Sequence, residues 1–242
     1  MMSSDIDQFQ GVVRLGGLYL RKSVVPRSLR PWLIDLSVLR PFEGLVPGDV
    51  ADFESAPQMD AWQLGDTPAD GANQLQWIRL SAQGRTLLIS DRVLLMRISW
   101  DDLHEAGYVD GRPVTIDGQR YRCRLLTGGS RFRGGDESDG YPGGWPLDNE
   151  WDRFVAAEAP IRDLPAPGAS DLDDSLDPGD QASPHNALWN WFGAVSWTQE
   201  PYALRDTARC CRGYRSARYF YLNTHSHRHE DIGWRPVLEP LP

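Results

Sequence analysis

The residue types most capable of chemistry lie near the C-terminus, where three histidines alternate at His225, His227 and His229. On an extended strand, side chains two residues apart lie on the same face. Two or three imidazoles can bind a metal ion, and Glu230 and Asp231 could add oxygen ligands. The same composition is also typical of an exposed polar loop. The spacing therefore leaves two interpretations open, a metal site and a solvent-exposed loop.

Two adjacent cysteines, Cys210 and Cys211, form a second candidate group, and the arginines around them would favour the thiolate that a nucleophile needs. Adjacent residues of a strand point to opposite faces, so we expect one of the two in the core. With Cys123 the chain holds 3 cysteines. This sparse, odd number favours a reducing compartment or an assembled particle over a disulfide-stapled secreted module.

Arginines recur at every third position from Arg209 to Arg218, a spacing that would not place them on one face of a strand. We therefore interpret Arg215, Arg218 and Arg235 as buried or half-buried pairing groups, and Trp234 beside Arg235 as a further structural residue. The carboxylates expected to pair with these arginines are Glu150, Asp152 and Glu200.

Tyrosine, asparagine and histidine side chains in the same stretch give the clearest candidate surface. These residue types combine large contact area with adaptable hydrogen bonding, as in antibody paratopes. Strand alternation over residues 219–227 would turn every second side chain outward while Phe220 and Leu222 face the core. Ordinary half-exposed strand aromatics are the alternative. The predicted ligand-binding residues are Tyr214, Tyr219, Tyr221, Asn223, His225 and His227, with Trp189 and Trp191 nearby.

The framework around these residues resembles a known family. Arg212-Gly213, the Arg-Ser-Ala-Arg element at 215–218 and the Ile-Gly-Trp-Arg-Pro-Val strand at 232–237 occur in this order. They are similar to the closing pattern of the formylglycine-generating-enzyme (sulfatase-modifying-factor) branch of C-type-lectin-like folds. That branch includes the variable proteins of diversity-generating retroelements, which display mutable Tyr, Asn, Ser and His residues for ligand binding. The resemblance covers roughly residues 186–239 and implies a scaffold with a binding role.

The chain departs from the enzymes of this branch at the residues that carry their chemistry. Those enzymes have a catalytic cysteine where this chain has Ser216, and a second glycine of the turn where it has Tyr214. Cys210 and Cys211 precede the turn, so the copper-binding cysteine pair does not carry over. The resemblance thus implies no catalytic residue and no cofactor. A metal- or thiol-dependent oxidoreductase of the same branch and a structural assembly subunit remain as alternatives.

Composition restricts the partners and the compartment. A net charge of -9 argues against general nucleic-acid binding. The first ten residues lack the basic and apolar regions of a signal peptide, and no apolar run is long enough to span a membrane. We expect a cytoplasmic or virion-associated protein, for example a phage-tail receptor binder, whose ligand is a protein or a surface glycan. A homo-oligomer or a particle assembly is compatible with this role.

The elements that must position these residues indicate an α+β fold. A small β-rich region is expected over residues 1–94, followed by a C-type-lectin-like domain over 95–242 with a disordered acidic insertion at about 159–185. Two strand-like runs flank Gln83-Gly84 and predict a strand pair around this turn. The Asp-Gly dipeptides at Asp110-Gly111 and Asp117-Gly118 predict hairpin turns. Short helices are expected at 101–106 and 149–157. The 10 tryptophans predict large buried anchors in a loop-rich core.

Overall fold

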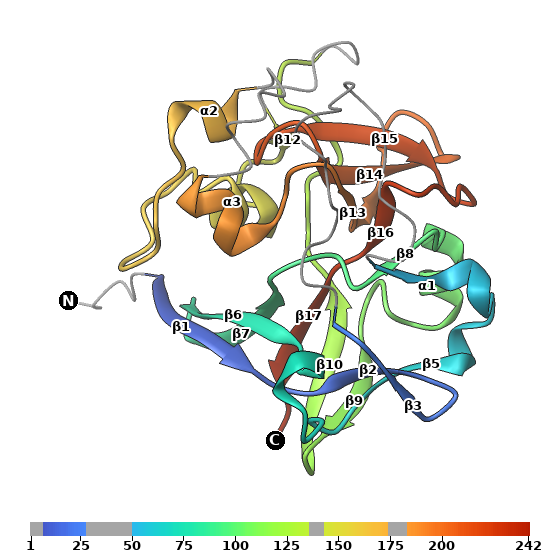
Figure 1. Cartoon of the computed structure of the whole chain (residues 1–242). Coiled ribbons are helices and arrows are strands. Elements are labelled where there is room, and N and C mark those ends of the chain that lie inside the picture. Colours follow the sequence, from blue (N-terminus) through green and yellow to red (C-terminus); the bar gives the residue numbers. More distant parts are fainter. Residues whose placement is uncertain (1–6, 28–49, 136–142, 174–182) are drawn as a thin grey trace, which may run out of the picture.

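A computed structural model describes residues 7–27, 50–135, 143–173 and 183–242 of the chain (Figure 1). Strands greatly outnumber helices, and the helices are short, so the expected α+β class with short helices is confirmed at this level. One large sheet occupies the lower half of the view and a second the upper half, with α2 (Ala169–Leu172) and α3 (Pro184–Trp189) beside the upper one. Among the described residues, no helix is long and apolar enough to cross a membrane.

The lower sheet has six antiparallel strands and joins the two ends of the chain. The strands in spatial order are β1 (Gln8–Arg14), β6 (Gln76–Ala82), β7 (Arg85–Ser90), β17 (Pro236–Pro240), β10 (Gln119–Leu125) and β9 (Arg112–Ile116). The last strand, β17, lies in its interior and is hydrogen-bonded on both sides, to β7 and to β10.

The upper sheet also has six strands and contains most of the C-terminal stretch. The pairs β13–β16 and β4–β8 are parallel and the other pairs are antiparallel. In spatial order the strands are β15 (Phe220–Thr224), β14 (Ala208–Gly213), β13 (Val195–Pro201), β16 (Ile232–Trp234), β8 (Leu95–Met96) and β4 (Ala51–Asp52). A domain boundary was predicted at residue 94. Each of the two large sheets contains strands from before this residue and strands from after it.

Two smaller sheets complete the strand inventory of the described residues. One contains β3 (Ser23–Val25), β2 (Gly17–Leu20) and β5 (Trp62–Gly65), and the other contains β11 (Arg131–Phe132) and β12 (Gly144–Trp145).

Two of the three predicted turns close hairpins. Gln83 and Gly84 join β6 to β7 with φ of 51° and 73°, and Asp117 and Gly118 join β9 to β10 with φ of 50° and 77°. Positive φ at both central residues is typical of the turn that matches strand twist. The prediction at Asp110-Gly111 is wrong, because the segment that leads directly into this dipeptide is the turn after α1 (Trp100–Glu105) and not a strand.

The helix predicted at 101–106 is present as α1 (Trp100–Glu105). Ser99 caps it by accepting a hydrogen bond from the Asp102 N–H, and the Asp102 carboxylate accepts one from the Ser99 N–H, a complete capping box. The second predicted helix is a single π-helical turn, η4 (Trp151–Val155). Three 3₁₀ turns precede α1 in the chain: η1 (Phe53–Ser55), η2 (Met59–Ala61) and η3 (Gly71–Asn73).

The predicted acidic insertion is structured over the part that can be described. Residues 159–173 include α2, and Ile161 packs in the core. Asp171 is buried, accepts hydrogen bonds from the Gly168 N–H and the Ser183 hydroxyl, and offers its backbone carbonyl to the Ala217 N–H. This segment therefore packs against the C-terminal framework, in contrast to the disorder we expected. Residues 174–182 of the insertion lie outside the described residues.

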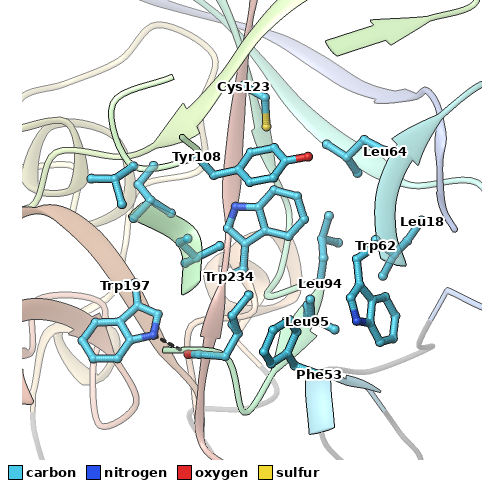
Figure 2. Close-up of a cluster of buried hydrophobic side chains, with 14 of the residues drawn as sticks. Leu18, Phe53, Trp62, Leu64, Leu94, Leu95, Tyr108, Cys123, Trp197 and Trp234 are labelled. Carbon is cyan, nitrogen blue, oxygen red and sulfur yellow. Dashed lines mark hydrogen bonds between the residues drawn. The ribbon is translucent and has the colours of Figure 1, made fainter. Parts of the chain in front are cut away.

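Tryptophans anchor the core as predicted. Figure 2 shows Trp62, Trp197 and Trp234 among the buried side chains of the largest hydrophobic cluster. Two of these ring N–H groups reach backbone carbonyls: Trp62 donates to Ala56 O at 2.8 Å and Trp197 to Ile98 O at 2.8 Å. Each such bond satisfies the one polar atom of a large apolar side chain, so the residue can be buried without an unpaired donor. The ring N–H of Trp234 is buried without a hydrogen-bond partner among the described residues.

Candidate ligand-binding site

The turn after β14 is tightly packed, and its small residues leave no room for larger side chains. Gly213 has a φ of +89°, and a Cβ there would lie 2.9 Å from the Ala194 carbonyl oxygen. Ser216 and Ala217 are fully buried, and the Trp151 ring N–H donates to the Ala217 carbonyl at 2.7 Å. This turn therefore holds the start of the Tyr-rich stretch in one conformation.

Arg212, at the end of β14, ties this turn to the rest of the fold. Its guanidinium is fully buried and lies 2.5 Å from a carboxylate oxygen of Asp152, which is also fully buried. It also donates to three backbone carbonyls, Tyr219 O at 3.2 Å, Arg218 O at 2.9 Å and Gly128 O at 2.8 Å. A buried guanidinium needs this number of acceptors, because each unpaired donor would cost free energy.

The three arginines predicted to be structural have partners that differ from those expected. Arg235 is buried, but it donates to Trp189 O at 2.6 Å, Asn190 O at 2.9 Å and the Ser196 hydroxyl at 3.1 Å rather than to a carboxylate. Arg235 directly follows β16, so these hydrogen bonds connect that strand to the C-terminal end of α3 and to β13. Trp234 beside it is fully buried. Both side chains are buried in the core.

The other two arginines lie nearer the surface. Arg218 forms an ion pair with Glu158 at 3.1 Å, and the Arg215 guanidinium lies 5.6 Å from the centre of the Tyr219 ring. The predicted carboxylates are used elsewhere: Glu150 binds Arg124 at 2.6 Å, and Glu200 accepts from the Gly128 N–H at 2.8 Å. Burial raises the pKa of the Glu200 carboxyl, and backbone N–H donors oppose this shift.

Five of the eight predicted ligand-binding residues converge on one pocket of about 320 Å³, which we call the recognition pocket. All of the predicted tyrosines, Asn223 and His227 line it, and Arg215 joins them. The complete lining is Val195, Tyr214, Arg215, Tyr219, Tyr221, Asn223, His227, His229 and Asp231. The pocket lies at the end of the upper sheet where β13 and β15 begin and β14 ends, and residues of the segment between β15 and β16 complete its lining.

Aromatic rings form two stacked pairs in the recognition pocket. The Tyr219 and Tyr221 ring centres are 6.0 Å apart at an interplanar angle of 19°, and those of His227 and His229 are 5.5 Å apart at 12°. Tyr221 is 44% exposed, so much of one ring face is open to a ligand. His229 Nδ1 lies 2.5 Å from a carboxylate oxygen of Asp231. The pocket thus offers flat aromatic area beside cationic, anionic and amide groups.

Tyr214 adds a phenol that stays neutral over the physiological range. Burial raises the pKa of Tyr214 to about 12, and the charge of Asp231 contributes in the same direction. Its backbone φ is 91°, which a non-glycine residue adopts only where surrounding structure enforces it. The neutral hydroxyl can both donate and accept a hydrogen bond.

Three predicted residues lie elsewhere. His225 Nδ1 is 2.5 Å from a carboxylate oxygen of Asp101 on α1, because β15 ends at Thr224 and the alternation ends with it. Trp189 and Trp191 are fully buried, so their assignment near the recognition face is wrong. Trp191 donates to His185 Nδ1 at 3.0 Å, which makes it a core anchor.

The sequence gave partial signals for the residues that it missed. Arg215 was assigned a structural role, although it directly follows Tyr214 in the framework turn. His229 and Asp231 were considered only as metal ligands. Among the described residues, no group of three His, Cys, Asp or Glu side chains is placed to hold a metal ion. Nothing in the local pattern indicated Val195, which comes from a strand distant in sequence.

Both cysteines of the adjacent pair are buried, although we expected only one in the core. β14 lies inside the upper sheet and is covered on both faces, so alternation moves neither side chain to solvent. Burial raises the pKa of both thiols, and also that of Cys123, far above the ordinary value. All three are therefore protonated, inert thiols at neutral pH.

Comparison with known protein families, with curated proteins and with solved structures finds no match to this chain. The fold and the site are therefore characterised by the chain's own residues. They define a sheet-rich α+β protein in which a rigid framework supports a pocket of stacked aromatic side chains.

Proposed function

We propose that this chain is a non-enzymatic binding protein that takes its ligand in the recognition pocket, on a C-type-lectin-like scaffold over residues 95–242. One observation carries the proposal. The Tyr, Asn and His side chains selected from their composition and order, with the exception of His225, line a single pocket instead of being scattered over the surface. The framework residues between which they lie are buried and hydrogen-bonded.

The physical basis of binding would be aromatic contact area on a preorganised surface. Tyrosine offers a large contact area with few rotatable bonds, so little conformational entropy is lost on binding. Arg212 fixes the backbone carbonyl of Tyr219, so that position is already set before a ligand arrives. Asn223 and the neutral Tyr214 hydroxyl would provide direction through hydrogen bonds. A protein loop or a surface glycan suits a pocket of this size and chemistry, in a phage tail or a retroelement variable protein.

The oxidoreductase alternative gains no support from the site. Its candidate thiols, Cys210 and Cys211, are buried with raised pKa values. His225, the first of the three histidines, is bonded to Asp101 instead of facing His227 and His229.

The test is a capture experiment with the Tyr219→Ala/Tyr221→Ala double variant. Fluorescently labelled protein is applied to a glycan array and to a phage-displayed library of random peptides, and the ligands that wild type captures are then titrated. Loss of a hot-spot aromatic side chain typically costs about 2 kcal/mol or more. We therefore expect at least a 30-fold loss of affinity, about 2 kcal/mol, with an unchanged circular dichroism spectrum.

Trp145→Ala provides the matched control. Trp145 is 52% exposed but does not line the recognition pocket, so its removal should leave capture unchanged. Undiminished capture by the double tyrosine variant would contradict the proposed function, as would equal loss in the Trp145 variant.

A further inference from the structure

A second cavity, of about 710 Å³, shares no lining residue with the recognition pocket. It lies between α1, the η2–β5 segment and β9, and we call it the α1 cavity. Its volume is within the range of small-molecule sites. It is lined by Pro57, Gln58, Met59, Asp60, Trp62, Gln63, Leu64, Asp102, Glu105, Ala106, Tyr108, Arg112, Pro113, Val114 and Thr115.

The inner wall of the α1 cavity is apolar and rigid. Trp62 and Leu64 on β5 are buried members of the largest hydrophobic cluster. Tyr108 packs against Trp234 with ring centres 4.7 Å apart, and Figure 2 shows its hydroxyl pointing toward Leu64. The inner wall is therefore a fixed apolar surface, and the Tyr108 hydroxyl lies beside its Leu64 side chain.

That polar atom has no partner. Tyr108 is only 3% exposed, and no described residue forms a hydrogen bond with its hydroxyl. Burial raises the pKa of Tyr108 to about 12, so the phenol is neutral and can both donate and accept. The hydroxyl is not among the fully enclosed polar atoms that lack a partner, so solvent can reach it. A ligand could therefore take the place of water at this hydroxyl and bond to it directly.

The rim of the cavity has excess negative charge. The carboxylates of Asp60 and Glu105 form no ion pair with any described residue, whereas Asp102 is bound by Arg228 at 2.6 Å. Arg112 is the one cation that lines the cavity within the described chain, and it is already engaged. Its guanidinium donates to Ala106 O at 3.1 Å and lies 4.9 Å from the centre of the Tyr108 ring.

We propose that the α1 cavity binds an organic cation: an apolar body against Trp62 and Leu64, a hydrogen-bonding group at the Tyr108 hydroxyl, and an amine or guanidine nitrogen at Asp60 and Glu105. The unpaired hydroxyl selects the hydrogen-bonding group of the ligand, and the unpaired carboxylates independently select its cationic nitrogen. An anion would meet two carboxylates and a guanidinium whose donors are partly used. The same chemistry is available from a free aromatic amine or from adjacent tyrosine and lysine side chains of a partner protein.

Tyramine, which has a phenol at one end and an amine at the other, is the first probe. We compare it by isothermal titration and saturation-transfer NMR with phenethylamine, 4-ethylphenol and 3-(4-hydroxyphenyl)propionate. A probe of this size is expected to bind with a Kd of about 1 mM. Tyramine should bind most tightly, and the anionic probe should not bind. A second arm uses the acetylated and amidated tetrapeptide glycine-tyrosine-lysine-glycine.

Three variants locate the binding. Asp60→Asn/Glu105→Gln should weaken tyramine at least about 10-fold, and Tyr108→Phe, which keeps the packed ring, should weaken tyramine about 5-fold but leave phenethylamine unchanged. Asp148→Asn/Asp206→Asn makes the same charge change at exposed carboxylates outside the cavity and should have no effect.

The outcomes are decisive in both directions. Binding of the peptide without binding of tyramine supports a partner protein as the source, and the reverse supports a small molecule. Binding of neither overturns the proposal, as does equal binding of the anion or wild-type affinity in the Asp60/Glu105 variant. Tyr219→Ala/Tyr221→Ala should bind tyramine normally, so failure here and failure of the recognition pocket can be told apart.

Discussion

Replacing Arg212 by glutamine tests whether the framework is held by one buried ion pair. The Arg212 and Asp152 side chains are both fully buried, and removing one partner of such a pair typically costs about 3–5 kcal/mol. Asp152 keeps the Asn149 amide at 2.6 Å and the Arg133 guanidinium at 3.2 Å in the variant. These remaining donors compensate part of the lost charge, so we expect a loss near the lower limit, about 3 kcal/mol.

Urea unfolding followed by circular dichroism measures this loss directly, and thermal unfolding should show a Tm lower by about 6–12 °C for a chain of this length. Arg131→Gln makes the same substitution at an exposed arginine and should be nearly neutral. Ligand capture at temperatures where the variant is folded should also weaken, because the Tyr219 carbonyl loses the Arg212 donor and keeps only the Gly213 N–H. A destabilisation below about 1 kcal/mol would refute the argument that a buried charge is left without its main partner.

Three further predictions concern the core. Gly233→Ala should destabilise the fold by about 2 kcal/mol or more in thermal unfolding, because a Cβ there would lie 2.4 Å from the Leu95 carbonyl oxygen. Gly168→Ala is the control and should be tolerated, because the nearest atom to its Cβ would be 3.5 Å away. Burial lowers the pKa of His185 to about 4 from the ordinary 6.5, so the unfolded chain takes up this proton first as the pH falls. Wild type should therefore lose of the order of 3 kcal/mol more stability than His185→Gln between about pH 6.5 and 4, and equal pH slopes in urea titrations would contradict this. The 3 cysteines should react with a disulfide reagent at pH 8 only after denaturation, and fast reaction of the native protein would show that a thiol is accessible.

The sequence determined the features that depend on a few neighbouring residues. The hairpins at Gln83-Gly84 and Asp117-Gly118 follow from residues that tolerate positive φ, and the Ser99 cap of α1 follows from side-chain bonds to nearby N–H groups. The Tyr and Asn members of the recognition pocket were also identified from composition and order. Their identification required only residue chemistry that suits a binding surface.

Tertiary structure decided which side chains of the C-terminal stretch are accessible. Alternation predicted an outward His225, but β15 ends one residue earlier and Asp101 on α1 holds this imidazole. The adjacent thiols of β14 are both buried because neighbouring strands and packed segments cover both of its faces, which no two-residue period can show. Arg215 and His229 enter the recognition pocket because the turn after β14 and the segment after β15 converge in space. Local backbone preferences act over a few residues, whereas burial and convergence depend on strands paired across the whole chain.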